Sequence, residues 1–159
     1  MLSGPRITAP SRAASPGTHP LWEGVAVSDE NVATVRASLE HFAATDEFLN
    51  VIAPDFVWDM GTFAGWPEQP QFHGAEGLRE FVTLWRAPYE NWSMRLQEVH
   101  DCADNRVLAL MEQSGRPHGS DAMVQLQYGL LHTIRDGKIR RIEVYATYDE
   151  AMQAAGLAR

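Results

Sequence analysis

Three runs of apolar and β-branched residues in the second half of the chain carry the clearest pattern. Val107–Gln113, Val124–Ile134 and Lys138–Ala146 each predict a strand. Asp136-Gly137 separates the last two runs, and Asp-Gly between apolar runs is a strong signal for a tight hairpin. A consecutive antiparallel meander has to bury one face, so we expect the preceding segments to cover it.

Helical spacing predicts what the covering segments are. Apolar residues recur at that spacing from Val32 to Phe42, which predicts a helix from Ser28, its N-cap, to about Ala44. Gly156 is placed to end a C-terminal helix in the left-handed conformation. The other expected elements are short helices over Asp46–Val51, Glu76–Trp85 and Asp149–Ala155, an edge strand over Asp55–Met60, a loop over Gly61–Gly74 and a strand over Trp92–Val99.

Together these elements predict an α+β fold. The economical arrangement is a cone-shaped, strongly bent antiparallel sheet wrapped around three N-terminal and central helices, with a short C-terminal helix. We assign residues 28–159 to this single domain. Residues 1–27 hold four prolines and no apolar periodicity, which predicts a disordered tail. A half-closed cone leaves a cavity between sheet and helices, where ligands are usually held.

Charge and composition exclude several classes of partner. The net charge of -8 at pH 7 disfavours nucleic acid and anionic membrane surfaces, which both bind through Lys and Arg. No window reaches the roughly 18 apolar residues that a membrane span needs. The lone Cys102 cannot form an internal disulfide, so we expect a cytoplasmic protein. Its neighbours Asp101 and Asp104 raise the thiol pKa, which favours a structural rather than a nucleophilic cysteine.

Metal and cofactor motifs are missing from the sequence. The six histidines show no HxH, HExxH or i,i+4 pairing, and one cysteine adds nothing to them. The chain has no glycine-rich nucleotide loop and no GxSxG turn for a nucleophilic serine. We therefore expect neither a metal nor a cofactor.

Several short motifs follow one another in a fixed order along the chain. They are Ala53-Pro54-Asp55 with Trp58, Gly65-Trp66-Pro67-Glu68, Phe72-His73-Gly74 leading into Gly77-Leu78-Arg79-Glu80-Phe81, Gly115-Arg116 with Gly119-Ser120, Thr133-Ile134-Arg135-Asp136-Gly137-Lys138-Ile139, and Tyr145 followed by Asp149-Glu150-Ala151 and Ala154-Ala155-Gly156-Leu157.

In this order, from about Asp29 to Leu157, the chain resembles the nuclear-transport-factor-2-like (NTF2-like) superfamily. The resemblance is to its SnoaL-like and ketosteroid-isomerase-like branch, and it implies the NTF2-like α+β barrel. It implies no single reaction, because the superfamily hosts isomerases, cyclases, dehydratases, epoxide hydrolases and non-catalytic binders.

The catalytic residues of ketosteroid isomerase do not carry over to this sequence. The position of its base is Met60 here, with Asp59 one residue earlier, so only a gapped alignment restores an acid. The position of its protonated oxyanion-hole Asp is Leu130, and no Tyr lies between Asp29 and Thr45. A steroid isomerase of the standard kind is therefore not expected.

Strand alternation selects the polar residues that face the cavity. If Leu130 faces inward, Tyr128 and His132 do so as well. By the register that the resemblance implies, Leu110 and Glu112 face inward on the neighbouring strand. Asp59 joins them only if the first strand bends or bulges at Met60, and it otherwise faces solvent. The candidate catalytic residues are therefore His132, Glu112, Asp59 and Tyr128.

These groups suit general acid–base chemistry, although each also has a structural interpretation. A carboxylate in an apolar pocket has its pKa raised by desolvation, a histidine titrates near neutral pH, and a tyrosine donates to a developing oxyanion. The alternatives are a hydrogen-bonded core histidine, a solvated glutamate at the rim and a tyrosine that only lines the wall. The apolar pocket walls are expected from Trp58, Met60, Phe63, Trp66, Trp85, Leu110 and Leu130.

Two hypotheses of function follow. The first is a cofactor-independent isomerase, cyclase or lyase, or an epoxide hydrolase, acting on a small, mostly apolar carbonyl or polyketide-like substrate. The second is a non-catalytic domain that binds a small hydrophobic ligand or only dimerises. Polar residues within hydrogen-bond reach of one another inside the cavity favour the enzyme, and a cavity lined only by aromatic residues favours the binder.

The outer face of the sheet predicts the assembly. On the strand Val107–Gln113, the residues assigned to this face are Val107, Ala109 and Met111, which form an apolar patch. Gln125, Gln127 and Thr133 on the next strand would form its polar margin. We therefore expect a homodimer through the outer face.

Overall fold

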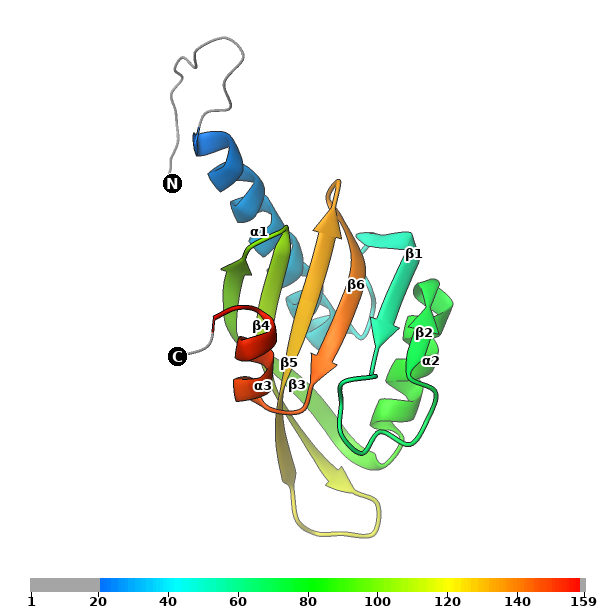
Figure 1. Ribbon diagram of the computed structural model, residues 1–159. Helices are drawn as coiled ribbons and strands as arrows, with labels where there is room; N and C mark the ends of the chain where they lie inside the picture. Colours follow the sequence, from blue (N-terminus) through cyan, green and yellow to red (C-terminus); the bar gives the residue numbers. More distant parts are fainter. Residues whose placement is uncertain (1–20, 158–159) are drawn as a thin grey trace.

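One six-stranded sheet, curved around two helices and covered by a third on its other face, makes up the molecule (Figure 1). The computed structural model describes residues 21–157. The strands lie in the order β2-β1-β6-β5-β4-β3, and all neighbours are antiparallel except β1 and β6. The elements are α1 (Leu21–Thr45), β1 (Ile52–Asp59), β2 (Gln71–His73), α2 (Gly74–Arg86), β3 (Tyr89–Cys102), β4 (Arg106–Pro117), β5 (Val124–Arg135), β6 (Lys138–Tyr145) and α3 (Tyr148–Ala154).

The predicted α+β cone is confirmed, as is the meander at its centre. β4, β5 and β6 pair consecutively and antiparallel, and Asp136 (φ 54°) and Gly137 (φ 74°) form the tight turn between the last two. Gly156 also adopts the left-handed conformation just beyond α3, as expected. The sheet is mixed rather than purely antiparallel, because β1 runs parallel to β6.

The N-terminal half differs from the sequence prediction at both ends of the first helix. α1 begins at Leu21, before the expected N-cap Ser28, and so includes the last part of the segment assigned to the disordered tail. Residues 1–20 of that tail lie outside the described residues. No helix forms over Asp46–Val51, because Asp46 adopts a left-handed conformation (φ 62°) that ends α1.

The first strand is not an edge strand. Part of the expected loop over 61–74 forms the three-residue strand β2, which pairs with β1 through Val57, Trp58 and Asp59. β1 therefore has a neighbour on each side, and β2 occupies the edge of the sheet. A very short edge strand exposes few unpaired backbone groups, which limits pairing with other chains.

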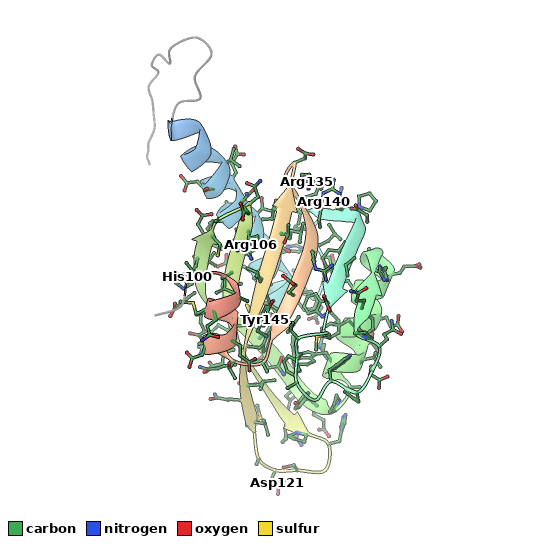
Figure 2. All side chains as sticks on the ribbon, in the orientation of Figure 1. His100, Arg106, Asp121, Arg135, Arg140 and Tyr145 are labelled. Carbon is green, nitrogen blue, oxygen red and sulfur yellow. The ribbon has the colours of Figure 1, made fainter. Side chains whose placement is uncertain are left out.

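Two apolar clusters lie on the two faces of the sheet. The larger one fills the concave face beneath α1 and α2, and the smaller one packs α3 against the outer face. α3 approaches β5 so closely that a Cβ on Gly129 would stand 2.3 Å from the Cβ of Ala151. Leu108 and Leu110 on β4 belong to the outer cluster. Arg106 donates to the carbonyl oxygen of Ala154 at the end of α3 over 3.3 Å (Figure 2).

The register of β4 contradicts the expected outer patch. Val107, Ala109 and Met111 pair with His132, Leu130 and Tyr128, so all six side chains share the inner face. The three β4 residues are fully buried in the larger cluster. The apolar outer patch was therefore a wrong expectation, and the predicted homodimer loses the surface on which it rested.

Candidate functional site

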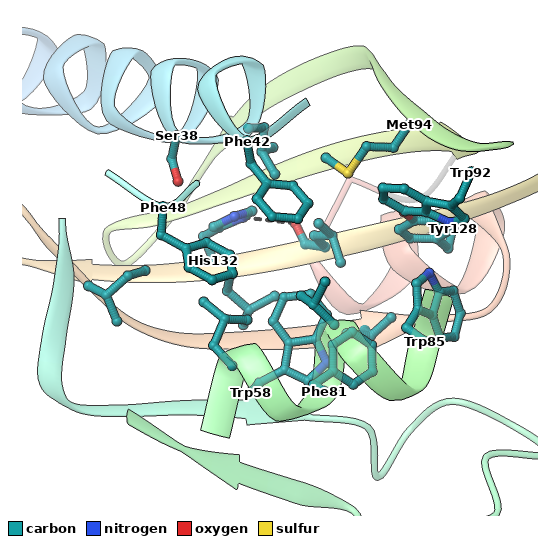
Figure 3. A pocket seen from close by; sticks show the side chains of 17 residues that line it. Ser38, Phe42, Phe48, Trp58, Phe81, Trp85, Trp92, Met94, Tyr128 and His132 are labelled. Atoms are coloured by element: carbon teal, nitrogen blue, oxygen red, sulfur yellow. Dashed lines mark hydrogen bonds between the residues drawn. The ribbon is translucent and has the colours of Figure 1, made fainter. Parts of the chain in front are cut away.

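A cavity of about 70 Å³ lies between the concave face of the sheet and the two helices that cover it (Figure 3). Its lining comes from α1, the segment that follows it, α2 and every strand except β2 and β4. None of the lining side chains carries a formal charge at neutral pH. They are Ser38, Leu39, Phe42, Phe48, Ile52, Trp58, Leu78, Phe81, Val82, Trp85, Trp92, Met94, Tyr128, Leu130, His132, Ile142 and Val144.

Aromatic side chains form a continuous wall along α2. The ring centroids of Trp58 and Phe81 are 4.4 Å apart, and those of Phe81 and Trp85 are 5.5 Å apart. Trp85 then meets Tyr128 of β5 edge to face at 5.6 Å. Such contacts restrict each ring to one orientation, so this wall is a preformed flat surface suited to an apolar ring.

His132 is the most informative polar group of the cavity. The residue is 1% exposed, and its Nδ1 lies 3.1 Å from the carbonyl oxygen of Leu130 (Figure 3). A carbonyl only accepts, so Nδ1 carries the proton and the lone pair is left on Nε2. Burial lowers the pKa of His132 to about 4, although backbone hydrogen bonds with Leu130 and Val107 act in the opposite sense. The imidazole is therefore neutral at pH 7, with one fixed tautomer.

Tyr128 supplies the second polar group of β5. The residue is 4% exposed, and burial raises the pKa of its phenol well above the ordinary value, so the hydroxyl stays protonated. Its Cα lies four residues from that of His132, about 13 Å along an extended strand. The two residues therefore line different parts of the cavity and can contact opposite ends of one ligand.

The β5 prediction is confirmed and the β4 prediction is wrong. Tyr128, Leu130 and His132 line the cavity as strand alternation required. Leu110 and Glu112 lie on the opposite face, because Leu110 pairs with Gly129 and Glu112 with Gln127. The Glu112 carboxylate accepts hydrogen bonds from Arg95 over 2.6 Å and Gln97 over 3.2 Å, and Leu110 packs beneath α3.

Asp59 also lies outside the cavity. Its strand neighbour Trp58 faces inward and Asp59 faces the outer side, where it forms an ion pair with Arg141. Its carboxylate also accepts from the backbone N–H of Gly61 over 2.7 Å. Met60 is 1% exposed and belongs to the inner cluster, so no bend at that position brings Asp59 inside.

Six of the seven expected wall residues divide into two groups, and the seventh, Leu110, lies on the other face of the sheet. Trp58, Trp85 and Leu130 line the cavity. Met60, Phe63 and Trp66 belong to the same cluster without lining the cavity. Phe63 and Trp66 pack behind Trp85, with ring centroids 5.5 and 5.9 Å from its own. They support the aromatic wall from outside.

Sequence reasoning missed Gln113 and Ser38. Gln113 is 3% exposed, and its Oε1 accepts a hydrogen bond from Trp85 Nε1 over 2.6 Å, which fixes the indole in place. The correct β4 register would have found it, because Gln113 pairs with the inward residue Leu126. Ser38 lines the cavity from α1, and its helical spacing from Val35 and Phe42 was the available signal.

Two indole donors in the cavity wall have no acceptor in the described part of the chain. The Nε1 atoms of Trp58 and Trp92 are buried and form no hydrogen bond there. A buried donor without a partner is unfavourable by about 1–3 kcal/mol. Both residues line the cavity.

Metal ligands do not gather within residues 21–157, where no three His, Cys, Asp or Glu side chains lie close enough to hold an ion. Across the same residues no helix is long and apolar enough to cross a membrane. Cys102 is buried on the outer side of the sheet, and burial, more than its acidic neighbours, raises its thiol pKa. This placement supports the structural interpretation of the cysteine.

Comparisons with solved structures agree with the fold. TerC, co-crystallised with polyporic acid, is 20% identical with a TM-score of 0.62, covering 79% of this chain and 97% of that one. A candidate SnoaL-like polyketide cyclase from Jannaschia sp. CCS1 is also 20% identical, with a TM-score of 0.60 and coverage of 94% and 99%. A Catenulispora acidiphila protein with a ketosteroid-isomerase-like fold, bound to trimethylamine, is 17% identical with a TM-score of 0.55, covering 78% and 92%.

The sequence comparisons assign the family. No curated protein sequence matches the chain. The model of the SnoaL-like domain matches residues 32–142, which extend from α1 to β6 and include nearly all of the cavity lining. The chain therefore belongs to the SnoaL-like domain family.

Proposed function

We propose that the cavity binds a small, mostly apolar, ring-bearing molecule that donates a hydrogen bond to His132. One observation carries this proposal: the Leu130 carbonyl fixes the His132 proton on Nδ1, which leaves Nε2 as an acceptor in an uncharged cavity wall. The aromatic wall along α2 supplies flat contact for the ring. The phenol of Tyr128 supplies a donor at some distance from His132.

Binding is favoured over acid–base catalysis because the cavity lacks the carboxylates expected there. Glu112 and Asp59 are held by Arg95 and Arg141 on the other face of the sheet. Two structurally similar proteins were crystallised with small molecules, polyporic acid and trimethylamine, which supports small-molecule binding in a cone of this kind. The neutral groups that remain, His132 and Tyr128, can select and orient a ligand.

Equilibrium dialysis with a matched pair of probes, 2-naphthol and naphthalene, tests the proposal. We expect the protein to bind 2-naphthol about 3- to 10-fold more tightly, because one neutral hydrogen bond is worth about 0.5–1.5 kcal/mol. His132→Phe keeps a ring but removes the acceptor, so it should abolish that preference. Val144→Phe fills the cavity and should abolish binding of both probes, whereas Glu112→Gln on the outer face should change neither.

Two results would contradict the proposal. One is equal affinity of the wild-type protein for the two probes, because His132 would then contribute no hydrogen bond. The other is unchanged binding in Val144→Phe, because the probes would then bind somewhere other than the cavity.

The fixed tautomer of His132 favours a second candidate, proton transfer by a cofactor-independent isomerase, cyclase or lyase. The lone pair on Nε2 is available to accept a proton at pH 7, and Tyr128 can donate to a developing oxyanion. A pKa near 4 makes His132 a weak base, which restricts the reaction to acidic C–H bonds such as those between two carbonyl groups. Polyketide-like substrates contain such bonds. His132→Gln should then lower turnover about 10²- to 10⁴-fold while the fold is kept.

A further inference from the structure

The cavity is too small for a ring-bearing ligand in the conformation described here. Its volume is about 70 Å³, whereas a cavity that holds benzene is about 150 Å³. A ligand of the proposed class therefore enters only if part of the wall moves. The cavity-lining residues Tyr128, Leu130 and His132 of β5 are paired in register with β4, and Leu130 and His132 also with β6, so the centre of the sheet is a well-held part of that wall.

The segment between α1 and β1 is a part of the wall that belongs to no helix or strand ladder at its middle, although Lys138 Nζ donates to the Asn50 carbonyl over 2.9 Å. Its ends are fixed, since Asp46 N–H donates to the Phe42 carbonyl over 2.8 Å and Ile139 N–H donates to the Val51 carbonyl over 2.7 Å. Within the described residues, no backbone–backbone hydrogen bond holds Phe48, at the middle of the segment. Phe48 nevertheless lines the cavity, so its displacement would open it.

On the outside of this segment lies a polar hollow that shares three walls with the cavity. Phe42, Phe48 and Val82 line both spaces. The rings of Phe42 and Phe48 are stacked, with centroids 5.0 Å apart and planes 4° from parallel. This stacked pair therefore borders both the cavity and the hollow. The other residues that line the hollow are Asp46, Glu47, Arg79, Thr83 and Arg86.

Arg86 joins three elements across the hollow. Its Nη1 lies 3.1 Å from Oδ1 of Asp46, and its guanidinium carbon stands 4.7 Å from the centroid of the Trp92 ring. It thus connects the end of α2 to the segment after α1 and to β3. Trp92 itself lines the cavity, so Arg86 holds the outer segment against a residue of the inner wall.

We propose that the Phe42–Phe48 stack is a gate to the cavity and that the Arg86–Asp46 ion pair holds it closed. A ligand would enter from the polar hollow when the segment 46–51 swings outward and separates the two rings. The class of ligand that passes the gate rests on the proposed function, but the opening of the gate does not depend on any ligand. The gate explains how a cavity this small can serve a larger ring-bearing ligand.

The test measures opening without any ligand, by the reaction of a buried thiol. Val144 is 1% exposed and lines the cavity, and Val144→Cys introduces a somewhat smaller apolar side chain. The reagent is 4,4′-dithiodipyridine, which is neutral, and mass spectrometry separates reaction at position 144 from reaction at Cys102. Cys102 is buried on the other face, so its rate reports opening of the rest of the fold.

Breaking the ion pair should accelerate reaction at position 144 alone. Asp46→Asn removes the charge and keeps a residue that tolerates the left-handed backbone, and we expect it to raise that rate on the order of three- to fivefold. Arg86→Gln also removes the contact with Trp92 and should raise it further. The matched control is Glu40→Gln, which breaks the exposed Arg36–Glu40 pair on α1 away from the hollow, and should change neither rate.

Two outcomes would overturn the gate. Either Asp46→Asn and Arg86→Gln change the rate at position 144 no more than Glu40→Gln does, or they accelerate position 144 and Cys102 by the same factor. The second result would mean that the ion pair stabilises the whole fold. If Val144→Cys does not fold, Ile142→Cys places the thiol on the same wall. Because no ligand is involved, failure of the gate and failure of the proposed function are observed in separate experiments.

Discussion

The two faces of the central sheet carry different kinds of polar group. On the inner face of β4 and β5, Tyr128 and His132 are almost completely buried and neutral. On the outer face, Glu112 forms an ion pair with Arg95, whose side chain is 72% exposed. Residues only one position apart along β4 therefore pack in the apolar inner cluster, as Met111 does, or pair with an exposed arginine, as Glu112 does.

This contrast indicates what kind of chemistry each face supports. Burying an isolated carboxylate costs far more than burying a neutral hydrogen-bonding group, so charged residues remain where water and a partner reach them. Under the proposed function, the inner face would select ligands by shape and by neutral hydrogen bonds. A charged ligand would lose its hydration there without gaining an opposite charge from the lining.

The largest expected effect comes from truncating the inner face. Leu130→Ala should lower the free energy of unfolding by about 2–5 kcal/mol, because Leu130 is 2% exposed and its removal enlarges the cavity. Gln127→Ala, on the exposed outer face of the same strand, should change it by less than about 0.5 kcal/mol. Urea unfolding measures both. Similar losses in the two variants would remove the distinction between the faces.

A pH dependence of similar size should come from His132. Its folded pKa, about 4, lies below the unfolded value of 6.5, so the unfolded chain binds a proton first as the pH falls. Stability is therefore fully present above pH 6.5 and should fall by about 3 kcal/mol between pH 6.5 and 4. Urea unfolding at pH 7, 5.5 and 4.5 should show that His132→Gln lacks this part of the loss. Equal slopes in the two proteins would mean that His132 is not buried as a neutral group.

A smaller effect should come from the hydrogen bond behind the aromatic wall. Trp85→Phe leaves Oε1 of Gln113 buried without its donor, which should lower stability by about 1–3 kcal/mol. Adding Gln113→Met removes the unpaired oxygen and should recover much of the loss. A double variant less stable than Trp85→Phe would mean that Gln113 stabilises the fold through other contacts.

The smallest effect is expected on the outer face. Glu112→Gln removes one charge of an ion pair whose arginine is exposed and whose glutamate is part-buried, and it should change the free energy of unfolding by less than about 1 kcal/mol. High salt should reduce even that difference, because exposed pairs are screened. A larger, salt-independent loss would show that Glu112 acts in a less hydrated environment than its contacts indicate.

The sequence predicted what local signals determine. Strand alternation placed Tyr128 and His132 beside Leu130, and Asp136-Gly137 predicted the hairpin between β5 and β6. The predicted register of β4 against β5 was wrong by one residue, because it was taken from the resemblance. The loop that joins the two strands, residues 118–123, is too long to determine the register by itself. This one-residue error assigned Glu112 to the inner face of the sheet and left Gln113 out of the candidate residues.

The N-terminal half shows a second limit, set by tertiary contacts. The spacing from Val32 to Phe42 predicted α1, but nothing local indicated that Asp46 would adopt the left-handed backbone that prevents the next helix. The side of the sheet that Asp59 would face also depended on pairing, since Trp58 lies opposite Ile142 and the ion pair with Arg141 follows from that register. Pairs between distant strands carry no sequence signal of their own.

Nitrogen NMR of the His132 ring at pH 7, recorded during a titration with 2-naphthol, tests the central claim most directly. We predict a neutral ring protonated on Nδ1 in the free protein. When 2-naphthol binds, the Nε2 chemical shift should change as expected for a nitrogen that accepts a hydrogen bond, while the Nδ1 chemical shift stays the same. Naphthalene should not cause this change. A ring already protonated at pH 7, or an Nε2 resonance that does not move when 2-naphthol is bound, would contradict the account.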